Sequence, residues 1–148
     1  MKYNILIIYD VPNWAYHFRA QALEKYAPED FSVTIASSFK ELLYKEEYHL
    51  VFFLPFVHVH QLTEYCNQIG KNPTIVTSFN IGWGYANNWL EETREYSDAV
   101  IINNFQMWDK SGRLPNTFYL PNGVDRDFSN TKSPSKIEDL RFFSFIER

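Results

Sequence analysis

The sequence predicts an α/β domain whose mainly parallel, doubly wound sheet carries helices on both faces. Runs of β-branched and aromatic residues recur at intervals of about 20 to 25 residues, which is typical of strands in such a sheet. Helical patterns lie between these runs, and this alternation favours right-handed crossovers between parallel strands. The chain has 148 residues, 45% of them hydrophobic and 18% aromatic, which suits a single packed core.

The first strand is expected at residues 3–9, where the apolar run is nearly continuous, as in a strand buried on both faces. Residues 10–13 are predicted to form a turn, and Asn13 is expected to cap the helix that follows at 14–26. Arg19 is expected on the exposed side of that helix, opposite the apolar residues. The apolar residues with helical spacing are Phe18, Ala22, Leu23 and Tyr26.

The same alternation continues along the chain. Further strands are expected at 31–36, 49–54, 73–79, 99–103 and 117–120. Helices are expected at 38–44, 58–69, 87–96 and 104–110. Gly70 ends the second of these helices, because glycine adopts the backbone conformation that follows a helix most readily.

The character of the sequence changes after residue 127. We assign residues 1–127 to one domain and residues 128–148 to a linker and a further strand. The linker is polar with one proline, and the strand is expected at 140–146. This strand either pairs at a sheet edge or is the first strand of a second domain that is missing or truncated in this chain.

Composition excludes several function classes. The formal net charge is -4, so the chain lacks the basic balance of a nucleic-acid-binding protein. Cys66 is the only cysteine, and His58 and His60 are two residues apart, so no metal site is expected. The N-terminal apolar run is too short for a signal peptide or a membrane span, and a cytoplasmic location is expected.

The candidate site lies at the carboxyl ends of the predicted strands, where open parallel sheets bind their ligands. Amide side chains hydrogen-bond to hydroxyl groups and indole faces pack against the C–H side of a pyranose, so this set suits a sugar. The candidate binding residues are Asp10, Asn13, Trp14, Ser78, Asn80, Gly82, Trp83, Asn103 and Asn104. The alternative is that many of them only form turns, since turns favour the same residue types.

No catalytic group is evident. His58 and His60 are the weak candidates because an imidazole titrates near neutral pH, and Asn80 is a third. An amide can hydrogen-bond but cannot act as a base near neutral pH. A small hydrolase that uses either histidine is a further alternative, but no nucleophile accompanies them.

Several segments together resemble a known enzyme family. The segments AVIINN (99–104) and FYLPNGVD (118–125) resemble the end of the N-terminal domain in GT-B glycosyltransferases of the family 4 type. DVPNWAYH (10–17) is similar to the first loop of members that act in surface-polysaccharide synthesis, and PTIVT (73–77) is similar to a strand of the family. LRFFSFIER (140–148) resembles the first strand of the donor domain, so the resemblance covers essentially the whole chain.

The resemblance implies a Rossmann-like acceptor-side domain of an enzyme that transfers a sugar from a nucleotide-sugar donor to a glycan or lipid-linked acceptor. It implies transfer with retention, without a metal or cofactor, in polysaccharide synthesis. The nucleotide sugar would bind through the missing domain, so this chain alone is expected to be inactive. Membrane contact is known among such enzymes, but no Lys/Arg cluster here predicts it.

By position, the resemblance implies that residues 10–14 face the donor phosphates and the acceptor, and that residues 78–84 border the reacting sugar. Two departures stand out. Pro12, Asn13 and Trp14 occupy the place of a glycine pair, and Asn80 stands near the place of a histidine. A stand-alone Rossmann-like module that binds a nucleotide or a glycan without catalysis is the alternative.

Overall fold

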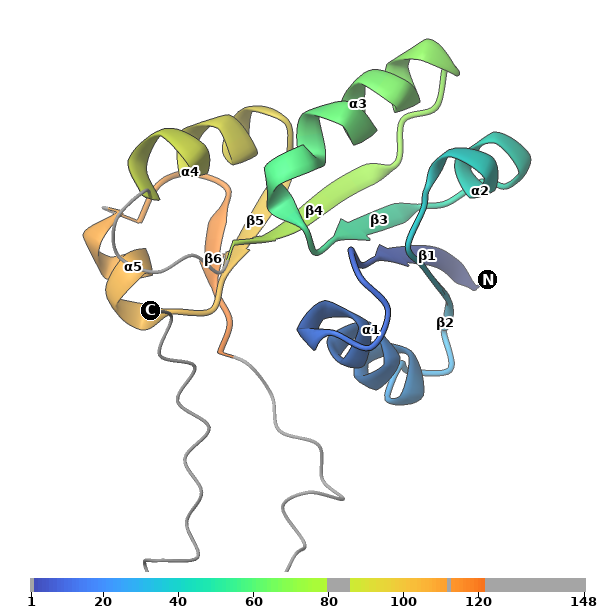
Figure 1. Ribbon diagram of the computed structural model, residues 1–148, viewed down its shortest axis with the longest axis horizontal. Coiled ribbons are helices and arrows are strands. Elements are labelled where there is room, and N and C mark those ends of the chain that lie inside the picture. The colour runs from blue at the N-terminus through green and yellow to red at the C-terminus, as the bar shows by residue number, and fades with distance from the viewer. Residues whose placement is uncertain (1, 80–85, 112, 122–148) are drawn as a thin grey trace, which may run out of the picture.

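The computed structural model describes residues 2–79, 86–111 and 113–121, which form one six-stranded sheet with helices on both faces (Figure 1). The strands are β1 (Tyr3–Ile8), β2 (Phe31–Ala36), β3 (Leu50–Phe53), β4 (Thr74–Phe79), β5 (Ala99–Ile102) and β6 (Thr117–Tyr119). The helices are α1 (Ala15–Lys25), α2 (Lys40–Lys45), η1 (Phe56–His58), α3 (Val59–Gln68), α4 (Ala86–Glu95) and α5 (Phe105–Lys110).

The strand order is β2-β1-β3-β4-β5-β6, and every neighbouring pair is parallel. This arrangement confirms the predicted fold class and is consistent with a Rossmann-like doubly wound sheet. The chain steps from β1 to β2 in one direction and then crosses back to β3. Because such crossovers are right-handed, α1 lies on one face and the later helices lie on the other (Figure 1).

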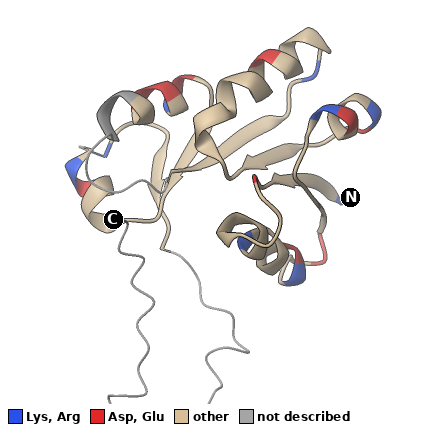
Figure 2. Cartoon of the chain, in the orientation of Figure 1, with Lys and Arg blue, Asp and Glu red and all other residues tan. Residues whose placement is uncertain are grey.

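The face beneath α2, α3, α4 and α5, here called the closed face, carries most of the core. Residues paired across a parallel ladder point to the same side, and Leu6, Val51 and Ile75 are such partners. All three are buried, and they pack with Leu62 and Cys66 of α3. The strands contain no charged residue, and the charged residues lie on helices and loops (Figure 2).

The opposite face, here called the open face, is covered only in part by the described residues. α1 packs over β2, β1 and β3, where Ala20 is fully buried against Ile7 and Leu54. Farther along the sheet, toward β6, the apolar residues on this face are half-buried or exposed. The two faces of the sheet therefore differ sharply in how well they are buried.

The beginning of α1 differs from its expected position. Trp14 is the N-cap of α1 and makes no side-chain cap hydrogen bond, so the prediction that Asn13 caps this helix is wrong. Asn13 instead has a left-handed backbone, with φ of 63°. Asparagine tolerates that conformation better than most residues, which explains why it stands in this turn.

Some sequence expectations lie outside the described residues. These are the candidate site residues Asn80, Gly82 and Trp83, the segment 122–125, and the expected linker and strand at 128–148.

Candidate functional site

The candidate site lies at the carboxyl edge of the sheet, beside the boundary between β1 and β3. The chain leaves β1 toward β2 on one side and continues from β3 toward β6 on the other. In open parallel sheets, ligands bind at such a switch point, beyond the carboxyl ends of the strands. The predicted residues that follow β1 and β5 belong to this edge, as does Ser78 near the end of β4.

The loop after β1 holds three of the predicted binding residues in a tight turn. One Asp10 carboxylate oxygen accepts the Val11 N–H at 2.7 Å, and the Trp14 N–H donates to the Val11 carbonyl at 3.3 Å. The turn leaves the Trp14 side chain 66% exposed. An exposed indole on a well-defined turn is available to stack against a ligand.

His17 holds this loop against α1, a role that was not predicted from the sequence. Its Nδ1 accepts the Asn13 N–H at 2.8 Å, so a neutral ring carries its proton on Nε2. The ring stacks on Tyr9 with centroids 4.4 Å apart. The signal in the sequence was the position of His17 in the first turn of α1, within reach of the loop before it.

Arg19 is also part of this edge, although it was expected on the exposed side of α1. That prediction is wrong: the side chain is half-buried and its Nη1 donates to Ser78 Oγ at 2.8 Å. The guanidinium also lies over the Phe52 ring, 6.0 Å from its centroid. Burial lowers the pKa of Arg19 below its ordinary value, but a guanidinium remains charged at neutral pH.

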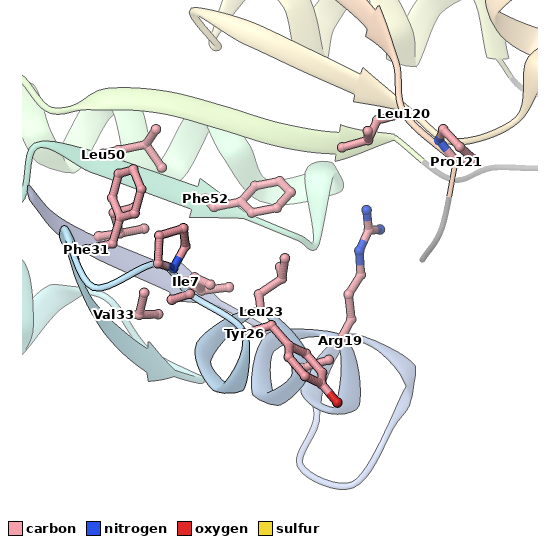
Figure 3. A pocket seen from close by; sticks show the side chains of 14 residues that line it. Ile7, Arg19, Leu23, Tyr26, Phe31, Val33, Leu50, Phe52, Leu120 and Pro121 are labelled. Carbon is pink, nitrogen blue, oxygen red and sulfur yellow. The ribbon is translucent and has the colours of Figure 1, made fainter. Parts of the chain in front are cut away.

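Helical spacing explains the position of Arg19. Residues at i+3, i+4 and i+7 share a helix face, so Arg19 shares its face with Ala22, Leu23 and Tyr26. These residues line one groove on the open face, together with apolar residues of the sheet (Figure 3). The small side chain of Ala22 makes room, and the arginine stem packs along the apolar wall.

The groove measures about 460 Å³ and is lined mostly by apolar side chains. Its floor includes Ile7 and Phe52, and Leu120 and Pro121 form the rim where β6 ends (Figure 3). Arg19 is the charged residue among its described lining residues. The groove therefore joins an apolar surface to a cation at the carboxyl edge.

The predicted residues after β5 take structural positions. Asn104 is the N-cap of α5, and its Oδ1 accepts the Met107 N–H at 3.1 Å. Asn103 is half-buried in the short connection between β5 and α5. The alternative that these residues have a structural role therefore accounts for Asn104. Ser78, by contrast, accepts a hydrogen bond from Arg19.

The two candidate histidines lie near the start of α3. His58 is exposed, whereas His60 is half-buried with its ring against Tyr96, at 6.0 Å between centroids. His60 also lines a cavity of about 30 Å³ beside Trp89, which is too small for a sugar.

Among the described residues, Cys66 and the acidic side chains do not form a metal site. Within residues 2–79, 86–111 and 113–121, no group of three or more His, Cys, Asp or Glu residues could hold a metal ion. Cys66 is buried in the closed-face core, and burial raises the pKa of its thiol. No helix in the same part of the chain is long and apolar enough to cross a membrane.

Comparisons with protein-family models, with curated proteins and with solved structures found no match.

Proposed function

We propose that this chain is the acceptor-side domain of a glycosyltransferase that transfers a sugar from a nucleotide-sugar donor to a glycan or other acceptor. The observation that carries the proposal is the loop after β1, which presents an exposed indole at the switch point of a doubly wound sheet. The sequence resemblance supplies the reaction class. In this proposal the nucleotide sugar binds to a second, donor-binding domain, which the described residues do not include.

The residues in and around the loop after β1 each have a chemical role in the proposal. Trp14 stacks against the apolar side of a pyranose ring. The Asn13 side-chain amide and the Asp10 carboxylate hydrogen-bond to sugar hydroxyls, and His17 keeps their loop in place. Arg19 places a positive charge beside Ser78, which suits an anionic group on either substrate.

The test is ligand-observed NMR on the 148-residue chain with a panel of oligosaccharides and nucleotide sugars. We expect oligosaccharide binding to be stronger than nucleotide-sugar binding. Trp14→Ala is expected to weaken it about tenfold, which corresponds to about 1.4 kcal/mol of stacking. We also expect no transfer and no hydrolysis of any nucleotide sugar by this chain alone.

Two further variants sharpen the test. Asn13→Gly removes the amide side chain while keeping the left-handed backbone, so a loss of affinity reports on the side chain itself. Tyr44→Ala removes an equally exposed aromatic side chain near the amino edge of the sheet and is expected to leave binding unchanged. Equal effects of Trp14→Ala and Tyr44→Ala would contradict the proposed site.

The alternative is a stand-alone binding module without catalysis. Nucleotide binding stronger than oligosaccharide binding, and unaffected by Trp14→Ala, would favour a nucleotide-binding module. Absence of binding to every oligosaccharide in the panel would overturn the acceptor-side proposal.

A further inference from the structure

The open face of the sheet presents a row of apolar side chains that the described residues leave uncovered. Phe52, Val76 and Ala99 are register partners across β3, β4 and β5, and Ile101 pairs with Phe118 farther along the strands. Phe52, Val76, Ala99 and Ile101 are half-buried, whereas Phe118 is 57% exposed. On the closed face, by contrast, Val100 and Ile102 of β5 are fully buried.

An apolar sheet face of this kind is normally buried by other elements. Parallel sheets occur almost only with both faces buried, and the strands here contain no charged residue on either face. α1 covers β2, β1 and β3, and its groove continues the uncovered surface toward β6. Exposed Leu23 and Tyr26 of α1 border the same surface, which makes the apolar area continuous.

The chain leaves the described part of the molecule at this same place. Leu120 and Pro121 line the groove, so the described part of the chain ends at its rim (Figure 3). Residues 122–136 can span up to about 50 Å if extended. The distance across three strand spacings is about 14 Å, so this length is more than enough to reach any part of the open face.

Residues 137–146, farther along the chain, have the composition of a segment that is buried against a sheet. In residues 137–146, six of ten residues are large and apolar: Ile137, Leu140, Phe142, Phe143, Phe145 and Ile146. A run of this composition is apolar on every side in any regular conformation, so it requires burial.

We propose that residues 137–146 dock on the open face of the sheet, against β3, β4, β5 and β6. The segment is then an integral part of this domain. The expectation that the same residues begin a second domain makes the opposite prediction, because they would leave the open face free. The inference goes beyond the proposed function and does not depend on it.

The test is paramagnetic relaxation on the complete 148-residue chain. A nitroxide is attached at Gln21→Cys on the exposed side of α1, and a control label is attached at Glu64→Cys on α3, over the closed face. Cys66 is buried and stays in place. We expect the Gln21→Cys label to broaden the amide signals of Phe142, Phe143 and Phe145, and the control label to leave them sharp.

The broadening of each amide signal, plotted along residues 122–148, distinguishes a docked segment from one that is only tethered at residue 121. A tail that is only tethered near α1 would show the greatest broadening next to residue 121, falling steadily toward residue 148. A docked segment shows a separate maximum within 137–146. The tethered profile, or no broadening, would overturn the proposal and leave the second-domain expectation in place.

A mixed sample shows whether residues 137–146 dock on their own chain or on a second copy. Isotope-labelled chains without nitroxide are mixed with nitroxide-labelled chains of natural isotope abundance. Broadening of residues 137–146 that appears in this mixture would mean that a second copy supplies the cover, and the proposal would be wrong. We expect the mixture to show none.

A pair of variants tests the apolar contact itself. Phe142→Ser combined with Phe145→Ser is expected to abolish the maximum and to shift the side-chain signals of Phe52 and Leu120. Arg141→Ser, a polar change inside the same segment, is expected to do neither. Equal behaviour of the two variants would contradict docking through the apolar side chains.

Discussion

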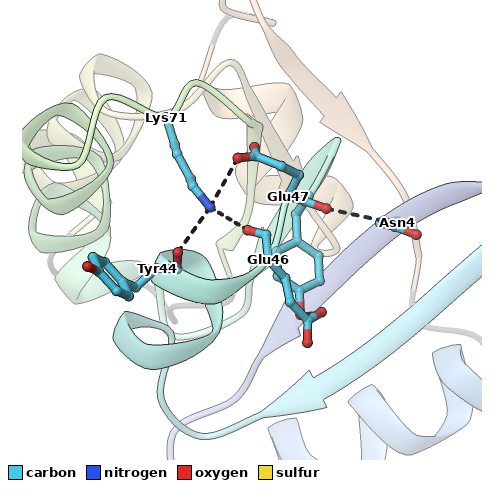
Figure 4. Close-up of polar contacts among 6 residues, drawn as sticks. Asn4, Tyr44, Glu46, Glu47 and Lys71 are labelled. Carbon is cyan, nitrogen blue, oxygen red and sulfur yellow. Dashed lines mark hydrogen bonds and ion pairs between the residues drawn. The ribbon is translucent and has the colours of Figure 1, made fainter.

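Lys71 joins the loop after α3 to the end of α2 at the amino edge of the sheet (Figure 4). Its Nζ donates to the Glu46 carbonyl at 2.6 Å and to the Tyr44 carbonyl at 3.5 Å, and it lies 3.2 Å from the Glu47 carboxylate. The side chain is only 15% exposed. It thus satisfies carbonyl groups at the end of α2 that have no helical partner of their own.

Replacing Lys71 with methionine tests this role, because methionine keeps the length of the side chain and removes the ammonium group. We expect the free energy of unfolding to fall by about 1–2 kcal/mol, since the carbonyl groups lose a charged donor. Lys45→Met is the matched control: it removes an exposed pair with Glu41 and should cost less than about 0.5 kcal/mol. Urea unfolding measures both, and equal losses would contradict the role of Lys71.

Two buried side chains make the fold sensitive to alkaline pH. Burial raises the pKa of the Cys66 thiol, with a smaller opposing effect from Lys71. Burial also raises the pKa of the Tyr48 hydroxyl, which donates to a Glu46 carboxylate oxygen at 2.9 Å. In both cases the folded state holds the proton more tightly than the unfolded state.

The sign of the pH dependence follows from these two shifts. Below about pH 7 both groups are protonated in both states, so they add no slope to the free energy of unfolding. Above that pH the unfolded state loses its protons first, and stability falls as pH rises. Urea unfolding from pH 7 to 10.5 should show this loss. Cys66→Ala should flatten the slope near pH 9, and Tyr48→Phe should flatten it near pH 10. A slope unchanged in both variants would contradict the assignment.

The residues that sequence reasoning misplaced in α1 share a physical cause. Arg19 is charged and was expected in solvent, but its stem packs along an apolar groove while its head bonds to Ser78. His17 serves the loop through its Nδ1. Residue type alone does not reveal such contacts, because they depend on side chains that are distant in the sequence or on the backbone of a turn.

At the scale of elements, the end of α3 was predictable from a single glycine. Gly70 has φ of +69°, its N–H donates to the Asn67 carbonyl at 3.2 Å, and the Lys71 N–H donates to the Cys66 carbonyl at 3.0 Å. This pair of hydrogen bonds is the Schellman arrangement that ends many helices. It also brings Lys71 to the amino edge of the sheet.

Substitutions at Gly70 should report on backbone strain alone. An added Cβ would meet no atom within 4 Å, so Gly70→Ala has room but must adopt the left-handed conformation. We expect a loss of about 1 kcal/mol in the free energy of unfolding. Gly70→Asn should cost less, because asparagine tolerates this backbone. Thermal unfolding compares them, and an alanine variant as stable as the natural chain would refute the strain.

Helix beginnings were harder to predict than strands. All six strands within the described residues lie inside or within a residue of their expected ranges, because buried parallel strands leave an uninterrupted apolar run. The N-caps of α1 and α2 are instead Trp14 and Phe39, which make no side-chain cap hydrogen bond. A cap placed by tertiary packing leaves no polar signature in the sequence. At α5 the cap is Asn104, and there the expected start is confirmed.

At the scale of the whole molecule, the site was only partly predictable because strand order is a tertiary property. The sequence predicts which residues follow each strand, and those after β1 and β5 do belong to the same edge. It does not reveal that β1 and β3 are neighbours, so the position of the switch point comes from the structure. The uncovered half of the open face was likewise unpredictable, because no described strand carries a charged residue that would mark one of its faces as exposed.

The sheet order also sets how stability is distributed over the molecule. β1, β3 and β4 each pair with two neighbours and include the fully buried Leu6 and Val51. β6 has three residues, pairs with β5 alone, and carries exposed Phe118. β2 is the other edge, and none of its residues is fully buried. Local opening is easiest where buried contacts are few, so the edges should open before the centre.

Native-state hydrogen exchange tests this order. We expect the amides of Leu6, Val51 and Ile75 to exchange only through global unfolding, with free energies equal to that measured in urea. The amides of β6 and of the solvent-facing side of β2 should exchange through smaller openings, lower by several kcal/mol. Docking of residues 137–146 on the open face would raise the protection of β5 and β6 amides relative to β2, and the Phe142→Ser, Phe145→Ser chain should lose that increase. Uniform protection across all six strands would contradict this order, because it would require the two edges to unfold only with the centre.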